Sequence, residues 1–120
     1  MTRGRFPASV FGVGDEPDAR FSLANERTFL AWNRTALALI AGGVALEALG
    51  LDLHPVLRLI ASLVLIAAGL ALPVIAWVEW ARTERALRLQ APLPGSHTGL
   101  VLSAVIVVVG VLIVFGVLQR

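Results

Sequence analysis

The sequence contains neither cysteine nor lysine, and its 120 residues include only two histidines. Without cysteine the chain cannot form a disulfide, a thiol nucleophile or a cysteine-ligated metal site. His54 and His97 have no companions at metal-ligand spacing, and no Ser–His–Asp arrangement, phosphate-cradling loop or paired-carboxylate motif is visible. We therefore expect that the protein is not an enzyme and binds no metal and no cofactor. We also expect no nucleic-acid binding, because only the number of arginines would favour it.

Charged residues are also scarce, at 15% of the chain, and every basic residue is arginine. Arginine keeps its proton in almost any environment and can hold an anion with two parallel hydrogen bonds. A GC-rich genome would explain the absence of lysine equally well. Hydrophobic residues make up 58% of the sequence and the mean hydropathy is +0.84, which is too apolar for a soluble domain of this size.

Three long apolar stretches occupy residues 29–51, 56–80 and 98–118. Each is close to the roughly 20 residues that cross about 30 Å of hydrocarbon. Backbone polar groups in lipid must be bonded within the segment, so we expect helices even in the valine-rich third stretch. The predicted fold is an all-α integral membrane protein with three transmembrane helices, at about residues 22–51, 56–89 and 97–119, in an oligomeric helical bundle.

Residues at the ends of these stretches predict where the helices begin, break and bend. Ser22 is a candidate N-cap for the first helix, and Gly50 should interrupt the chain after it. Pro73 removes one backbone hydrogen bond and should kink the second helix. Ser96 or Thr98 can cap the third helix.

Residues 1–20 lack the apolar core of a signal peptide and are predicted to form a flexible cytoplasmic arm, ahead of a membrane domain over residues 21–120. Most arginines lie before the first span or between the second and third: Arg3, Arg5, Arg20, Arg27, Arg82, Arg85 and Arg88. Because arginine is enriched in cytoplasmic loops, the N-terminus is expected in the cytoplasm and the C-terminus outside.

Arg27 and Arg34 are seven residues apart and therefore share one face of the first helix. Small residues continue this face, at Ala38, Ala41, Ala45 and Ala48. Small residues let helices approach closely, so the stripe predicts a packing face, a pore-lining face, or one that changes into the other. Arg34 itself could extend to the interface, pair with a glutamate at position 26 or 79, or contact an anion.

Other polar residues suggest contacts between helices. Glu26 and Asn33 share a second face of the first helix, and with Asn25 and Glu79 they form a predicted structural clamp. Glu47 should form an ion pair with Arg58 near the outer end of the spans, although a buried Glu47 could instead carry protons.

Arg82, Arg85 and Arg88 follow one another at intervals of three and form a single stripe after the second span. Such a stripe can set the topology and bind anionic lipid headgroups. Alternatively, it can combine with Arg27 in a basic collar around a cytoplasmic opening.

The stretch "LANERTFLAWNRTALALIAGGVAL" resembles the signature of the small membrane family called domain of unknown function 202 (DUF202), which includes bacterial YidH-like proteins. The matching positions are Leu23, Ala24, Asn25, Glu26, Arg27, Thr28, Leu30, Trp32, Arg34 and Thr35. The three-span layout and the later "WARTERAL" are also similar, so the resemblance covers about residues 20–118. Asn33 departs from the usual pattern, and no family role is carried over to it.

The resemblance implies a location in the bacterial inner (plasma) membrane. It also implies a relation to the membrane part of the yeast vacuolar transporter chaperone complex, which makes polyphosphate and moves it across a membrane. Five copies of the three-helix unit surround a central path there, so the likeness favours a homo-pentamer in the lipid bilayer. Arg27 and Arg34 would then face the pore, and the stripe over residues 82–88 would lie near the cytoplasmic mouth.

Three functions remain open from the sequence. The first is a homo-oligomeric conduit for anions such as phosphate or polyphosphate, in which arginines offset the cost of dehydrating the anion. The second is a non-transporting membrane scaffold or regulatory subunit of a larger complex. A proton-coupled exporter using Glu47 fits less well, because Glu47 lies near the end of its span rather than at the midplane.

Overall fold

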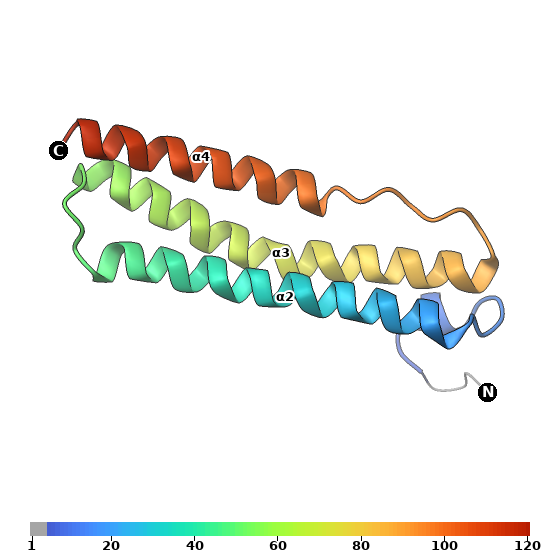
Figure 1. The fold of residues 1–120 in the computed structure, drawn as a ribbon. Coiled ribbons are helices and arrows are strands. Elements are labelled where there is room, and N and C mark those ends of the chain that lie inside the picture. Colours follow the sequence, from blue (N-terminus) through green and yellow to red (C-terminus); the bar gives the residue numbers. More distant parts are fainter. Residues whose placement is uncertain (1–4) are drawn as a thin grey trace.

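The computed structural model describes residues 5–120 and contains no strand in that part of the chain. Its helices are α1 (Ala8–Phe11), α2 (Ala19–Ala48), α3 (Pro55–Leu89) and α4 (Thr98–Leu118). The three long helices run side by side in an elongated bundle of 60 × 25 × 20 Å (Figure 1). The all-α fold with three helices long enough to span a membrane is therefore confirmed.

Helix α2 begins earlier than the sequence predicted, and Ser22 is not its cap. Asp18 is the N-cap: its carboxylate accepts hydrogen bonds from the backbone N–H of Arg20 at 2.8 Å and from the guanidinium of Arg20 at 2.8 Å. Both hydrogen bonds hold the pKa of Asp18 below its usual value, and the bond from the Arg20 side chain has the larger effect. Ser22 lies one turn inside α2, where its hydroxyl points to a different partner.

The turn between α2 and α3 follows the predicted break. Gly50 has a φ of +60°, which an L-amino acid with a side chain rarely adopts, and α3 begins at Pro55. The backbone N–H of His54 donates to the carbonyl of Gly116 at 3.0 Å. This bond ties the turn to the last residues of α4, so all three long helices are joined at this end.

Helix α3 is the central element of the bundle. It packs against both α2 and α4, whereas the backbones of α2 and α4 do not approach each other closely within the described residues, although Leu46 of α2 and Val109 of α4 share a small hydrophobic cluster with Ala61 of α3. Figure 1 shows α3 changing direction in its yellow segment, and the helix contains Pro73, whose missing backbone N–H removes one helical hydrogen bond. The first described residues lie at one end of the bundle and the C-terminus at the other.

The contact between α2 and α3 depends on small residues. A Cβ atom added at Gly43 would lie 2.8 Å from the carbonyl oxygen of Ser62, and one at Gly69 would lie 2.8 Å from that of Ala36. Both glycines therefore permit a close approach of the two backbones, as is typical of helices in membranes. The hydroxyl of Ser62 donates to the carbonyl of Gly43 at 2.6 Å, across the same contact.

Large hydrophobic side chains cover the outside of the bundle rather than its centre. Leu37, Leu70 and Leu100 are 68%, 65% and 71% exposed, while half of the buried hydrophobic residues are alanine. Such a surface is unfavourable in water but suits the hydrocarbon of a bilayer.

Candidate functional site

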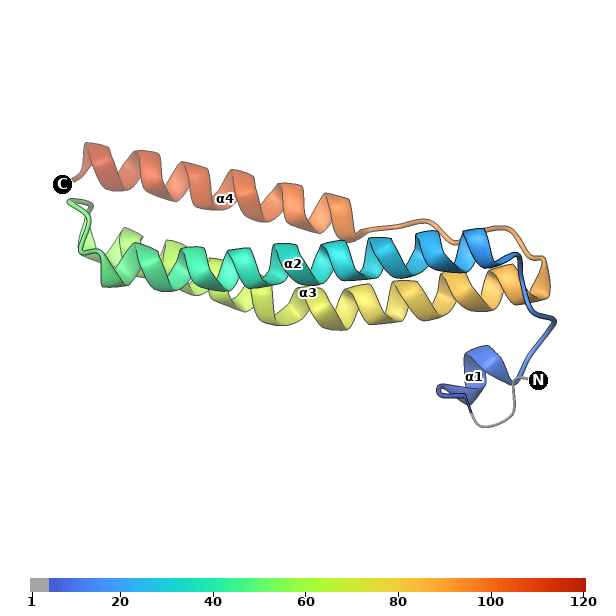
Figure 2. The ribbon, with the colours of Figure 1, turned by 60° about the horizontal axis from the view of Figure 1, so that its bottom comes forward.

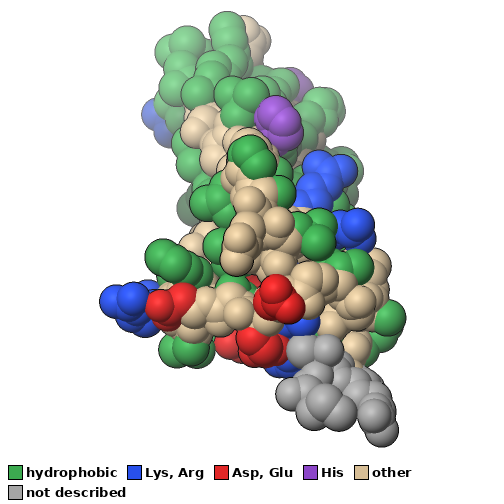
Figure 3. Space-filling model, turned by 90° about the vertical axis from the view of Figure 1, so that its right-hand side faces the viewer, with side chains coloured by type: hydrophobic (Ala, Val, Ile, Leu, Met, Phe, Trp, Pro, Cys, Tyr) green, Lys and Arg blue, Asp and Glu red, His purple; other side chains and the backbone are tan. Residues whose placement is uncertain are grey.

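Polar side chains gather at the end of the bundle that carries the N-terminal residues, which we call the arm end. Here the start of α2, the last turns of α3 and residues 5–18 meet, and α1 lies beside α3 (Figure 2). Viewed from this end, acidic and basic side chains stand together in front of a largely hydrophobic body (Figure 3).

Glu84 of α3 is the centre of the first polar network. Its side chain is only 4% exposed, and its two carboxylate oxygens accept hydrogen bonds from the Ser22 hydroxyl at 2.7 Å and from the Asn25 amide at 3.1 Å. The Asn25 amide also donates to the carbonyl of Trp80 at 3.1 Å. These bonds join α2 to α3, and both partners of the carboxylate are uncharged.

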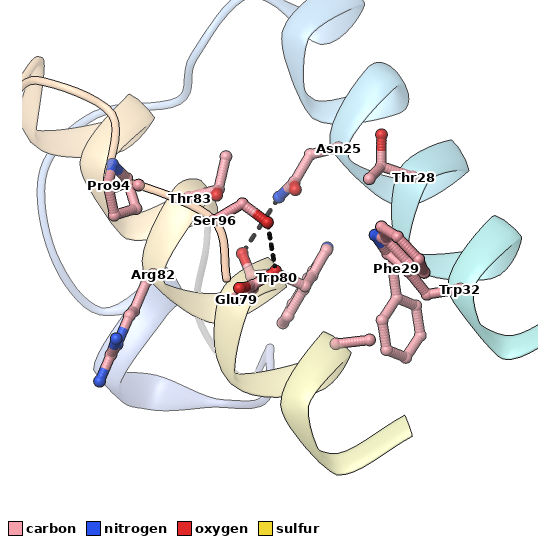
Figure 4. A pocket seen from close by; sticks show the side chains of 12 residues that line it. Asn25, Thr28, Phe29, Trp32, Glu79, Trp80, Arg82, Thr83, Pro94 and Ser96 are labelled. Atoms are coloured by element: carbon pink, nitrogen blue, oxygen red, sulfur yellow. Dashed lines mark hydrogen bonds between the residues drawn. The ribbon is translucent and has the colours of Figure 1, made fainter. Parts of the chain in front are cut away.

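Glu79 is the centre of a second network, which joins α3 to α4. Its carboxylate accepts hydrogen bonds from the Ser96 hydroxyl at 3.0 Å, from the backbone N–H of His97 at 2.9 Å and from the Thr98 hydroxyl. Figure 4 shows Glu79 and Ser96 turned toward each other beside Trp80. A negative charge at this position also interacts favourably with the N-terminus of α4.

The predicted helix cap and the predicted clamp both need correction. Neither Ser96 nor Thr98 caps α4 with its own side chain, because both hydroxyls donate to Glu79 instead. Of the predicted clamp residues, Asn25 and Glu79 do connect helices. Asn33 donates only to the carbonyl of Phe29 in its own helix, and Glu26 is exposed without a salt bridge among residues 5–120.

Sequence reasoning missed Glu84, which is the most buried carboxylate of the arm end. A weak signal was present: Ser22 and Asn25 are three residues apart on α2 and so share a face with one another. Nothing in the sequence, however, indicated that Glu84 lies opposite this face.

Arg88 does not contribute to an open basic collar. Its guanidinium donates to the carbonyl of Val13 at 2.8 Å, the carbonyl of Phe11 at 3.2 Å and the Glu16 carboxylate at 3.1 Å, and the side chain is 1% exposed. These bonds use most of its donors, so an anion could reach Arg88 only after the N-terminal residues moved away.

The N-terminal residues predicted to be flexible are held on α3 by further contacts. Arg85 donates to the carbonyl of Ser9 at 3.0 Å, and the backbone N–H of Asp15 donates to the carbonyl of Arg88 at 3.0 Å. Gly14 permits this approach, since it has a φ of +59° and an added Cβ atom would lie 2.1 Å from the Arg88 carbonyl oxygen. Arg85, like Arg88, therefore serves to dock this segment.

Arg27 and Arg34 lie on the opposite side of α2. Arg27 is nine residues from the buried Ala36, which places them about 180° apart around the helix, and Arg34 is about 160° from Ala36. Both arginines are exposed, and neither pairs with a carboxylate among residues 5–120, so Arg34 meets neither Glu26 nor Glu79. Ala38, Ala41 and Ala48 on the same face are exposed too.

Two further arginines, Arg20 and Arg82, also lie at the arm end. Arg20, seven residues before Arg27, shares its face but is paired with Asp18 at 2.8 Å. Arg82 of α3 is exposed, and Figure 4 shows its side chain pointing away from the neighbouring polar groups.

At the other end of the bundle, Glu47 and Arg58 lie together as the sequence suggested. Nε of Arg58 is 3.2 Å from the Glu47 carboxylate, and Nη1 donates to the carbonyl of Leu51 at 2.7 Å. The pair connects the end of α2 to the start of α3. Within the described residues no group of three or more metal-ligating side chains is found.

Comparison with known proteins places the chain in a family. A family model described as "Domain of unknown function (DUF202)" matches residues 20–86. The inner membrane protein YidH of Escherichia coli (strain K12) is 44% identical over 102 residues, which cover 84% of this chain and 89% of that protein. The uncharacterized protein MT2333 of Mycobacterium tuberculosis (strain CDC 1551 / Oshkosh) is 44% identical over 97 residues, or 80% of each chain. No solved structure matches. With three helices apolar and long enough to cross a bilayer, the chain belongs to the DUF202 family of small inner membrane proteins that includes YidH.

Proposed function

We propose that the protein is a homo-oligomeric membrane conduit for anions such as phosphate or polyphosphate. The observation that carries this proposal is the exposed face of α2 with Arg27 and Arg34, which points away from α3 and has no carboxylate partner among residues 5–120. A charged side chain on a transmembrane helix usually faces a bundle interior or a water-filled path. The three long helices do not enclose such an interior by themselves, because α2 and α4 do not close around a space, so we infer that another copy of the chain provides it.

The residues that follow Arg34 suit this arrangement. Ala38, Ala41 and Ala48 leave room for a second helix or for a narrow path along the face. A ring of arginines would lower the cost of dehydrating an anion at the entrance, and apolar side chains further along would restrict its passage. A pentamer, the stoichiometry favoured by the family resemblance, places five copies of the face around one axis, with the arm end in the cytoplasm and Arg82 near the opening.

Flux measurements in liposomes test the conduit. The purified chain is reconstituted with labelled phosphate inside, and release is compared for the wild type, Arg34→Gln and Arg120→Gln. Arg120 is a matched control because it also carries one positive charge, but it lies at the other end near Asp52, at 3.6 Å. Release that is lost in Arg34→Gln and kept in Arg120→Gln supports the conduit. Equal release from all three proteins, or none above empty liposomes, contradicts it.

A non-transporting scaffold or regulatory subunit is the second candidate. Arg88 favours it, because its guanidinium is buried against the N-terminal residues and is not free to contact an anion. In this case the networks around Glu79 and Glu84 hold the helices rigid for a protein partner. Co-purification of a second membrane protein at a constant ratio, together with no phosphate flux, would favour the scaffold over the conduit.

A further inference from the structure

A cavity at the arm end lies apart from the arginines of the proposed anion path, and its wall includes Ser22, Glu84 and Arg88 of the networks described above. Its volume is about 530 Å³, within the range of roughly 300–1,000 Å³ found for small-molecule sites. Residues of the arm form one wall, and the first turns of α2 and the last turns of α3 form the others. The exposed Arg27 and Arg34 do not line it.

Aromatic rings make up much of the cavity wall. Phe6 stacks on Trp77 with ring centroids 6.3 Å apart, and Phe11 lies 6.1 Å from Trp80. Phe29 of α2 lies 6.0 Å from Trp77, and the two tryptophan rings are 5.0 Å apart. The faces of aromatic rings carry partial negative charge and attract cations, and groups of such rings bind quaternary ammonium ions in particular.

The carboxylates of the cavity wall add to this preference. Glu84 is buried and receives hydrogen bonds only from neutral groups, and Glu26 has no salt bridge among residues 5–120. A buried carboxylate without a cation is costly, so a bound positive charge would stabilise it.

The positive groups of the same wall are already occupied. Arg5 and Arg88 both bind the carboxylate of Glu16, and both lie over the ring of Phe11, with Cζ 4.4 and 5.6 Å from its centroid. The lining thus contains two arginines and three glutamates, at positions 16, 26 and 84. With the arginines bonded to one glutamate and to backbone carbonyls, the groups left for a ligand are acidic.

We propose that this cavity binds an organic cation, an ammonium group on an apolar body. The ammonium group contacts Glu84 and the aromatic cluster of Trp77 and Trp80, and the apolar body lies against Phe29 and Leu23. An ethanolamine lipid headgroup and a free amphipathic amine share this chemistry and are its two sources. The site is distinct from the proposed conduit because neither Arg27 nor Arg34 lines it, although Leu23 borders both surfaces.

Calorimetric titration of the full chain in phosphatidylglycerol nanodiscs tests the proposal. The probes are hexyltrimethylammonium, hexanol and hexyl sulfate, which share a six-carbon chain and differ in charge, and empty nanodiscs provide the background. We expect hexyltrimethylammonium to bind at one site per chain, about tenfold or more tightly than hexanol, a difference of about 1.4 kcal/mol. Hexyl sulfate should not bind at this site. If phosphatidylethanolamine in the discs weakens binding of the cation, the lipid headgroup competes for the site and is its natural ligand. If binding is unchanged, the natural ligand is a free amine.

Two variants keep the proposal falsifiable. Glu84→Gln removes the charge but retains an acceptor for Ser22, and we expect it to weaken cation binding about tenfold. Because Glu84 also joins two helices, a second variant is needed. Trp77→Leu removes a ring that is 39% exposed, and it should weaken binding of the cation but not of hexanol. Asp52→Asn, an exposed carboxylate at the other end, is the matched control. Unchanged cation binding in both variants, or hexyl sulfate binding as tightly as the cation, would overturn the proposal.

Discussion

The carboxylate of Glu79 on α3 accepts a hydrogen bond from the hydroxyl of Thr98 at the first residue of α4, and Thr98 is completely buried. The two residues are 19 positions apart in the chain, and residues 90–97 between them form no helix. Glu79 therefore does for α4 what an N-cap side chain does for most helices, but from a neighbouring helix. This contact fixes the start of α4, whereas the bond between His54 and Gly116 ties its other end.

Replacing Glu79 by alanine should destabilise the bundle. The change leaves the Ser96 hydroxyl, the His97 N–H and the buried Thr98 hydroxyl without their acceptor, and an unsatisfied buried donor costs about 1–3 kcal/mol. Unfolding in mixed micelles, followed by circular dichroism, measures the loss. Glu26→Ala is the control, since Glu26 is exposed and unpaired among residues 5–120 and should change stability by less than about 0.5 kcal/mol. Equal stability of the two variants would contradict the role given to Glu79.

Removing Arg88 should release the N-terminal segment. Arg88→Gln loses bonds to the carbonyls of Val13 and Phe11 and the ion pair with Glu16, so amides in residues 5–18 should exchange faster with deuterated solvent. Mass spectrometry of the N-terminal peptides measures the exchange. Arg82→Gln, on the same helix but exposed, should leave these peptides unchanged. Unaltered exchange in Arg88→Gln would show that the segment is held by other contacts.

Adding one methyl group at Gly69 should separate α2 from α3. Its Cβ atom would lie 2.5 Å from Ile40 Cγ1 and 2.8 Å from the carbonyl oxygen of Ala36, and such overpacking typically costs about 1–3 kcal/mol. The same substitution at Gly110 meets nothing within 4 Å and should stabilise α4 slightly, because alanine favours helix more than glycine. Thermal unfolding of Gly69→Ala and Gly110→Ala in detergent compares the two, and a more stable Gly69→Ala would contradict the close contact.

These contacts also show how much of the structure can be predicted from the sequence. The three long helices follow from the length and apolarity of the stretches, because hydrocarbon requires internally bonded backbone whatever the neighbours are. The break at Gly50 and the bend near Pro73 follow from local backbone geometry. The contact of Glu47 with Arg58 could also be predicted, because only a short turn separates the two helices that carry them.

Contacts between distant residues could not be predicted in this way. Arg88 and Val13 are 75 residues apart, and only the folded chain shows that the N-terminal segment uses the donors of Arg88. The shared face of Arg27 and Arg34 was evident from their spacing, but the face of α2 that packs on α3 was not. This packing face is centred on Ala36 and Gly43 rather than on the alanines that follow the arginines. Small residues are needed there because the backbones of Ser62 and Gly69 on α3 approach α2 closely.

A double-mutant cycle on Glu47 and Arg58 tests the contact at the end opposite the arm. The pair is partly buried at 3.2 Å, so Glu47→Gln and Arg58→Gln should couple by about 0.5–3 kcal/mol in the free energy of unfolding. Arg58→Gln should be the more destabilising single change, because Arg58 also donates to the carbonyl of Leu51 at 2.7 Å and that acceptor would lose its partner. Unfolding of the wild type, both single variants and the double variant in the same micelles measures the coupling. Strictly additive effects would mean that the two charges stabilise the turn independently, and that Arg58 acts through Leu51 alone.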